Sequence, residues 1–130
     1  MASITFRMNQ YKDLIAVSNT KVYQKEKNVD NIAVLLPRTY NDVDLADFKV
    51  MLKYIDFANA IHSEEMEKDE EIYEDVYYRY VFPITEEFTQ IAGEVSFTLS
   101  VEKGEEQVLH TNSAAIEILP LKDYAPFKKE

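Results

Sequence analysis

Several short segments of this chain alternate between apolar and polar residues, and this period of two limits the fold more than any other feature. In Glu94–Val101 every second residue is apolar, and Glu, Ser or Thr stands between. Phe48–Ile55 and Ile72–Phe82 show the same alternation. Because successive side chains of a β-strand point to opposite faces of a sheet, such segments are typical of strands with one buried face. The pattern predicts a protein built mainly from β-strands.

The stretch Val34–Ile55, VLLPRTYNDVDLADFKVMLKYI, predicts a strand, a polar turn and a second strand. Its first part belongs to the continuous apolar run Ile32–Leu36, which is typical of a strand buried on both faces. Pro37 follows and has no amide donor, so strand pairing should change there. We expect the second half of the chain to supply pairing partners for both strands.

Further strands are predicted from shorter alternating segments, and one short helix from Thr85–Ala92, with Thr85 as N-cap and Gly93 at its exit. Together these give about eight or nine short strands at the spacing expected of sandwiches. The predicted fold class is therefore all-β: a single antiparallel β-sandwich, Ig-like or jelly-roll-like, forming one domain over residues 1–130. The further strand segments are Ser3–Met8, Tyr11–Val17, Thr20–Gln24, Gln107–Thr111 and Ala114–Leu119.

Two segments lack a strand pattern. Residues 56–71 are rich in Glu and Asp with sparse apolar residues, so we expect a solvated acidic loop. Residues 120–130 form a charged, proline-containing C-terminal tail that carries Tyr124 and Phe127. Apolar residues on such a tail favour docking against another surface.

The net charge of −10 disfavours partners that are themselves anionic, so we expect neither nucleic-acid binding nor attachment to acidic membranes. The chain has no cysteine, which excludes disulfides and thiolate metal sites. Residues 1–10 show no apolar signal-peptide core, and we find no apolar run long enough to span a membrane. These features predict a soluble protein made in the cytoplasm.

Candidate chemical sites are weak, and each has a simpler structural interpretation. Asn41, Asp42 and Asp44 could bind a hard cation, but a turn between two strands is the favoured alternative. The acidic segment could hold a metal or a partner, but a solvated surface is favoured. His62 and His110 lack the neighbours of a nucleophile or zinc motif. We therefore predict no enzyme activity and assign no catalytic, cofactor-binding or metal-binding residue.

The tyrosine-rich strand Ile72–Phe82 offers an interaction surface. Alternation sends Tyr78 and Tyr80 toward the core and Tyr77 with Arg79 to the opposite face. Because aromatic residues and Arg are enriched at protein interfaces, Tyr77 and Arg79 are interface candidates, and Tyr124 and Phe127 of the tail join them.

Two stretches of the sequence resemble a known family. VLLPRTYNDVDLADFKVMLKYIDFAN resembles a phage virion pattern in which an apolar strand ends in Pro-Arg and a "Y-N/D-x-V-D-L" turn leads to an alternating strand. YYRYVFPITEEFTQIAGEVSFTLSVEKGEEQVLHTNSAAIEI resembles the second half of the same domains, although Phe82 stands where Trp is frequent. These are β-sandwich domains of phage tails and baseplates, similar to the N-terminal domain of baseplate upper proteins of phages that infect Gram-positive bacteria.

The resemblance implies a non-enzymatic structural protein of a phage virion or phage-tail-like particle, in the tail, baseplate or fibre-attachment region. Its partners would be other virion proteins and further copies of itself in a homo-oligomer or ring, and no cofactor is implied. It would be made in the host bacterial cytoplasm. Two alternatives stay open: a head decoration protein of the capsid, and a carbohydrate- or receptor-binding module.

Overall fold

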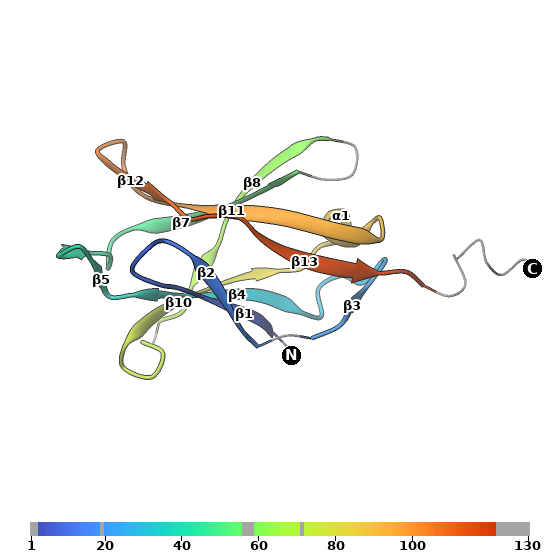
Figure 1. The fold of residues 1–130 in the computed structure, drawn as a ribbon, viewed down its shortest axis with the longest axis horizontal. Coiled ribbons are helices and arrows are strands. Elements are labelled where there is room, and N and C mark those ends of the chain that lie inside the picture. Colours follow the sequence, from blue (N-terminus) through green and yellow to red (C-terminus); the bar gives the residue numbers. More distant parts are fainter. Residues whose placement is uncertain (1–2, 19, 56–58, 71, 122–130) are drawn as a thin grey trace, which may run out of the picture.

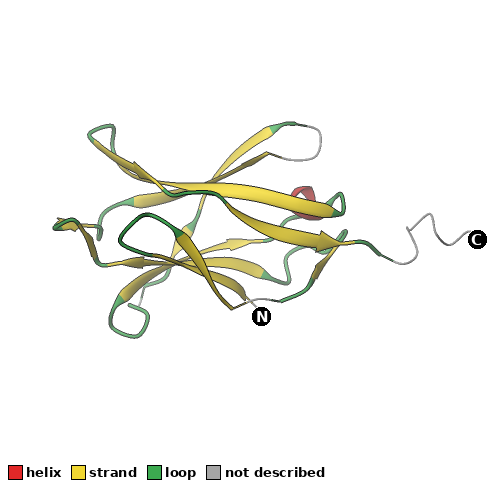
Figure 2. Cartoon of the chain, in the orientation of Figure 1, coloured by secondary structure: helices red, strands yellow, loops and turns green. Residues whose placement is uncertain are grey.

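The computed structural model describes residues 3–18, 20–55, 59–70 and 72–121. Strands dominate both layers of the molecule, and α1 is a single helical turn (Figure 2). In chain order the elements are β1 (Ser3–Met8), β2 (Leu14–Ser18), β3 (Val22–Tyr23), β4 (Asn31–Pro37), β5 (Thr39–Tyr40), β6 (Val43–Asp44), β7 (Lys49–Ile55), β8 (Ile61–Glu65), β9 (Glu67–Lys68), β10 (Tyr77–Pro83), α1 (Glu86–Thr89), β11 (Gly93–Lys103), β12 (Gln107–His110) and β13 (Ala114–Leu119). The predicted all-β class is confirmed.

The strands form two facing sheets (Figure 1). The first has the order β2-β1-β4-β10-β9, and the second has the order β3-β13-β11-β7-β8 with β12 also paired to β11. The strand pairing is antiparallel, as predicted, except in two places: β1 runs parallel to β4, and β3 runs parallel to β13. The expected number of strands is too low: β5, β6 and β9 have two residues each and leave no alternation to detect, and β8 lies in the segment that was expected to be a loop.

The predicted strand–turn–strand unit connects the two sheets. β4 lies in the first sheet with Ile32 to Leu36 all buried, and β7 lies in the second sheet. The small β5–β6 hairpin joins them through Asn41 and Asp42, which both have positive φ, as a two-residue type I′ turn requires. β10 pairs with β4 and β11 pairs with β7, so the second half of the chain does supply both partners.

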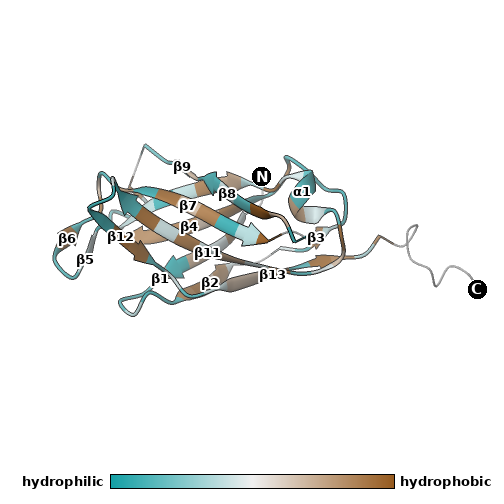
Figure 3. Ribbon diagram, turned by 90° about the horizontal axis from the view of Figure 1, so that it is seen from above, coloured by the Kyte–Doolittle hydropathy of each residue, from teal (hydrophilic) through white to brown (hydrophobic). Residues whose placement is uncertain are grey.

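One hydrophobic core fills the space between the sheets. Phe6 of β1 and Phe97 of β11 meet edge to face there, with ring centroids 5.3 Å apart. Along β7 buried side chains alternate with exposed or half-buried ones. Along β11 apolar residues alternate with polar ones from Glu94 to Glu102 (Figure 3). Ser100 departs from the alternation: it is fully buried, although the pattern predicted an outward side chain, and its hydroxyl donates a hydrogen bond to Glu102 Oε2 at 2.6 Å.

The acidic segment 56–71 is not the solvated loop that its composition predicted. Ile61–Glu65 forms β8 along β7, and Glu67–Lys68 forms β9 along β10, so this stretch contributes to both sheets. Met66 lies between the two strands, is 3% exposed, and donates its amide hydrogen to the carbonyl oxygen of Val50 at 2.8 Å. One buried methionine and backbone pairing therefore hold a segment whose other side chains are mostly solvated.

The predicted helix is present but shorter than expected. Thr85 occupies the N-cap position in an extended conformation, and its side chain makes no capping hydrogen bond. Phe88 points into the core, and Thr89 is buried and donates its hydroxyl hydrogen to the carbonyl oxygen of Glu26 at 2.7 Å. The turn thus closes one end of the sandwich.

Candidate interaction surface

The outer face of the first sheet carries the predicted interface residues Tyr77 and Arg79. Both are half-buried on β10, while Tyr80 is buried and Tyr78 packs against the core. The alternation of β10 therefore orients these four side chains as the sequence predicted. That Tyr77 and Arg79 contact a partner protein remains a prediction.

Arg79 is already engaged within the chain. Its Nη1 donates to Asp69 Oδ2 at 2.8 Å and its Nη2 donates to Ser3 Oγ at 3.3 Å. The arginine side chain is 25% exposed, so the pair is only partly open to water. These contacts tie β10 to the segment after β9 and to β1, which gives Arg79 a structural role at this face.

Tyr77 connects this face to the edge of the sheet. It pairs with Tyr73 across a tight turn in which Glu74 and Asp75 both have positive φ. Tyr73 and Tyr77 help to line a hollow of about 230 Å³ whose far side includes Val17 of β2. The tyrosines and the edge strand therefore border one continuous surface.

Strand β2 was expected from its sequence, but not as a candidate site. It forms one edge of the first sheet, and in the described part of the chain it pairs with β1 alone. Ile15 is 39% exposed and Val17 is 52% exposed, and the strand LIAVS contains no charged residue.

Native edge strands usually carry charges, prolines or bulges that prevent pairing with other chains. Here a register shift between Thr5 and Phe6 of β1 is the one such feature at this edge within the described residues. The residues on both faces of β2 are mostly apolar, and this was the sequence signal that could have identified the strand as a candidate interaction edge.

The opposite edge of the same sheet is acidic. Glu67 lies on β9 and Glu70 follows it, while Glu64 and Glu65 lie on β8, the neighbouring edge of the second sheet; all four are exposed. Two exposed lysines accompany them: Lys49 lines the hollow beside β9, and Lys68 hydrogen-bonds the carbonyl oxygen of Ala46 and lies 4.3 Å from the centre of the Tyr78 ring. An open hollow of about 570 Å³ lies beside these strands, and its lining includes Phe48, Met66 and Tyr80.

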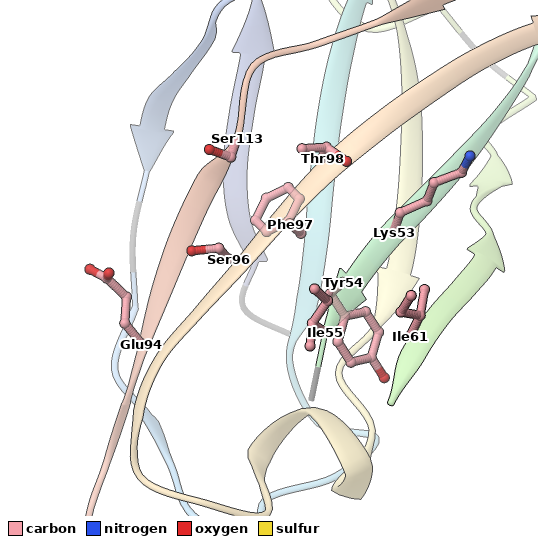
Figure 4. Close-up of a pocket in the computed structure, with 9 residues that line it drawn as sticks. All are labelled: Lys53, Tyr54, Ile55, Ile61, Glu94, Ser96, Phe97, Thr98 and Ser113. Carbon is pink, nitrogen blue, oxygen red and sulfur yellow. The ribbon is translucent and has the colours of Figure 1, made fainter. Parts of the chain in front are cut away.

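A further hollow of about 480 Å³ lies on the outer face of the second sheet (Figure 4). Ile55 of β7 and Ile61 of β8 lie on one side of it, and the hydroxyls of Ser96 and Ser113 on the other. Ile55 and Ile61 are 56% and 77% exposed. The hollow is open and mixed in character, as suits a weak contact with an apolar group.

Among the described residues, Tyr80 has a marked shift of its pKa, and its contacts give it a structural role. Burial raises the pKa of Tyr80 from 10.0 to about 12, with a smaller contribution from nearby Tyr78. The Tyr80 hydroxyl donates to the carbonyl oxygen of Phe48 at 3.0 Å, so it holds β10 to the start of β7. His62 stacks on Tyr54 with ring centroids 4.6 Å apart, and His110 lies on β12. Among the residues that the structure describes, no three His, Asp or Glu side chains are grouped to hold a metal ion.

The other two interface candidates, Tyr124 and Phe127, lie outside the described residues. Within residues 3–121, gaps aside, no helix has the length and apolar character needed to cross a membrane.

Comparison with known proteins gives a likeness of fold. No protein-family model matches the sequence. No curated protein matches it either. The structure is similar to the solved N-terminal domain of phage TP901-1 ORF48, with a TM-score of 0.49 and 12% sequence identity over 94% of this chain and 100% of that domain. At this identity the likeness concerns the fold alone.

Proposed function

We propose that this chain is a non-catalytic structural protein of a phage virion or phage-tail-like particle. It is made in the host cytoplasm, becomes part of the virion, and acts through protein–protein contacts in the tail, baseplate or fibre-attachment region. The phage assignment rests on the resemblance of Ile32–Ile118 to phage tail and baseplate domains. The quoted motifs of that resemblance correspond to β4, the β5–β6 hairpin, β7, and the run from β10 through α1 to β13.

The observation that carries a binding role is the exposed, uncharged edge strand β2 on a chain of net charge −10. Such an edge offers unpaired backbone groups and apolar side chains to an added strand, as in β-strand addition between proteins. The surface formed by Tyr73 and Tyr77 borders this edge and extends the possible contact. The tail residues Tyr124 and Phe127 are proposed as additional contacts.

Mass spectrometry of purified particles from phage-producing cells tests this proposal. We expect the chain at a fixed number of copies per particle, and fewer copies after deletion of residues 122–130. A chain that is absent from purified particles would contradict the structural role. If it instead bound a host-cell glycan in a direct binding assay, the receptor-binding alternative would replace it. Labelling of the head rather than the tail in electron micrographs would replace the tail position with capsid decoration.

A further inference from the structure

Charge is distributed unevenly along this chain. The first 27 residues contain five basic and two acidic side chains, a net charge of +3, which leaves −13 for the rest of the chain. The basic segment includes β1, β2 and β3, and it ends beside α1, where Lys27 forms an ion pair with Glu86. The charged residues around β2 are Arg7, which pairs with Ile15 in register, Lys12 and Asp13 in the preceding turn, Lys21 after the strand, and Glu74, which lines the same hollow as Val17.

The two edges of the first sheet differ in both charge and polarity. β2 at one edge is apolar and is flanked by more basic than acidic residues, whereas β9 at the other edge continues from β8 among exposed glutamates. In Figure 3, β8 and β9 lie along one long side of the molecule and β2 along the other. Asp69 on the acidic side is paired with Arg79, whereas Lys49 and Lys68 keep their charges. The four exposed glutamates outnumber these two cations, so the net charge of this side is negative.

The acidic edge also offers space for apolar side chains. The hollow beside β9 is lined in part by Phe48, Met66 and Tyr80. Its charged lining residues are three acidic and two basic ones: Asp47, Glu65, Glu67, Lys49 and Lys68. An incoming strand with exposed apolar side chains and basic neighbours matches this arrangement, because apolar burial and charge attraction would act together.

We propose that copies of this chain associate head to tail, with β2 of one copy docking against the acidic β8–β9 edge of the next. The two contacting surfaces are different: β2 is one edge of the first sheet, whereas β9 is its other edge and β8 is the neighbouring edge of the second sheet. A dimer formed in this way therefore still has one free surface of each kind. Such heterologous contacts form a ring where the rotation between copies closes, and a filament where it does not. This inference rests on the proposed function, since it identifies the partner that the assembly role requires.

Paired variants with one blocked edge each test the head-to-tail contact. The first is Val17→Pro, which disturbs β2 as a pairing edge; Ile15→Asn with Val17→Asn is its replacement if Val17→Pro does not fold. The second is Glu64→Lys with Glu67→Lys, which reverses the charge of the receiving edge. Val29→Asn is the control, because Val29 is 60% exposed and lies outside both edges.

Sedimentation velocity then compares the full-length proteins at increasing concentration. We expect the natural chain and Val29→Asn to form oligomers larger than dimers that weaken at high salt. Each edge variant alone should be monomeric, and an equal mixture of the two should give a one-to-one heterodimer, since one intact edge of each kind remains.

Other results would overturn the head-to-tail contact. A dimer of the glutamate variant that is lost in the Val17 variant would show β2 pairing with β2. A natural chain that stays monomeric at every concentration would show that self-association is absent. A monomeric chain that is still found in purified particles would contradict the head-to-tail contact and leave the structural role intact. Oligomers in solution without any particle-bound chain would contradict the structural role and leave the edge contact intact.

Discussion

Phe97 shows how single residues hold the two sheets together. Its side chain is 1% exposed and meets Phe6 of the opposite sheet. Phe97→Ala should lower the free energy of unfolding by about 3–5 kcal/mol, because it removes buried apolar surface and leaves a cavity. Ser96→Ala, at the exposed neighbouring position, should change it by less than about 0.5 kcal/mol. Urea unfolding measures both, and equal losses would contradict the orientation of β11.

Tyr80 should make stability depend on alkaline pH. Its pKa is raised from 10.0 to about 12 in the folded chain, so between these values the folded state keeps a proton that the unfolded state releases. The stabilisation from this group is therefore complete below pH 10 and is lost as the pH rises through 12. Urea unfolding between pH 10 and pH 12 should show a falling free energy of unfolding. The fall should be smaller in Tyr80→Phe, which lacks this ionisable group.

Absorbance titration of the folded protein checks the same group directly. One phenol should ionise near pH 12, and that late step should be missing in Tyr80→Phe. Tyr11→Phe is the matched control, because Tyr11 is 72% exposed. If the late step persisted in Tyr80→Phe, the assignment would be wrong.

At the scale of elements, the sequence pattern identified most strands, including the two-residue β3 within Thr20–Gln24, and missed β5, β6, β8 and β9. Val95 to Val101 gave β11 because one face is buried and the other mostly solvated. In β8 and β9, backbone pairing and one buried residue, Met66, outweigh a composition typical of loops. The parallel pairing of β1 with β4 depends on contacts between distant segments, which local pattern does not encode. Alternation is a local pattern, so it predicted which face of β10 carries Tyr77 and Arg79. It could not predict the ion pair of Arg79 with Asp69, because that contact depends on how distant segments pack in the folded chain.

Met66 should therefore matter for folding although it lies among glutamates. Met66→Ala should cost about 2–5 kcal/mol of unfolding free energy, since the side chain is 3% exposed and joins the core. The control Glu64→Ala alters an exposed position and should have little effect. If thermal melting gave the same midpoint for Met66→Ala and the natural chain, the segment would be a solvated loop after all.

The turn at Glu74 and Asp75 offers a stabilising change. Both residues adopt positive φ, 52° and 60°, which disfavours side chains other than Asn and Gly. Glu74→Asn with Asp75→Gly should raise the unfolding free energy by about 1 kcal/mol, because the new residues adopt this geometry without strain. Glu106→Gly serves as control, since Glu106 is not at positive φ, and should not stabilise. A stability loss in the double variant would contradict the turn geometry.

The whole molecule is a two-layer sandwich whose first sheet ends in two unlike edges. One edge, β2, is apolar with more basic than acidic neighbours; the other, β9, lies beside β8 of the second sheet, and together these two strands form an acidic side of the molecule. Repulsion between chains of net charge −10 opposes random association, so contacts that place unlike edges together would be selected over others. This asymmetry favours an ordered assembly over irregular clustering.

Amide hydrogen exchange, compared between the isolated chain and the chain in purified particles, tests this account most directly. We expect amides of Ile15–Ser18 and of Glu64–Glu67 to exchange more slowly in the particle, because added strands protect backbone donors. The amide of Val29, in an exposed segment away from both edges, should exchange at the same rate in both states. Unchanged exchange along β2 in the particle would contradict assembly through this edge.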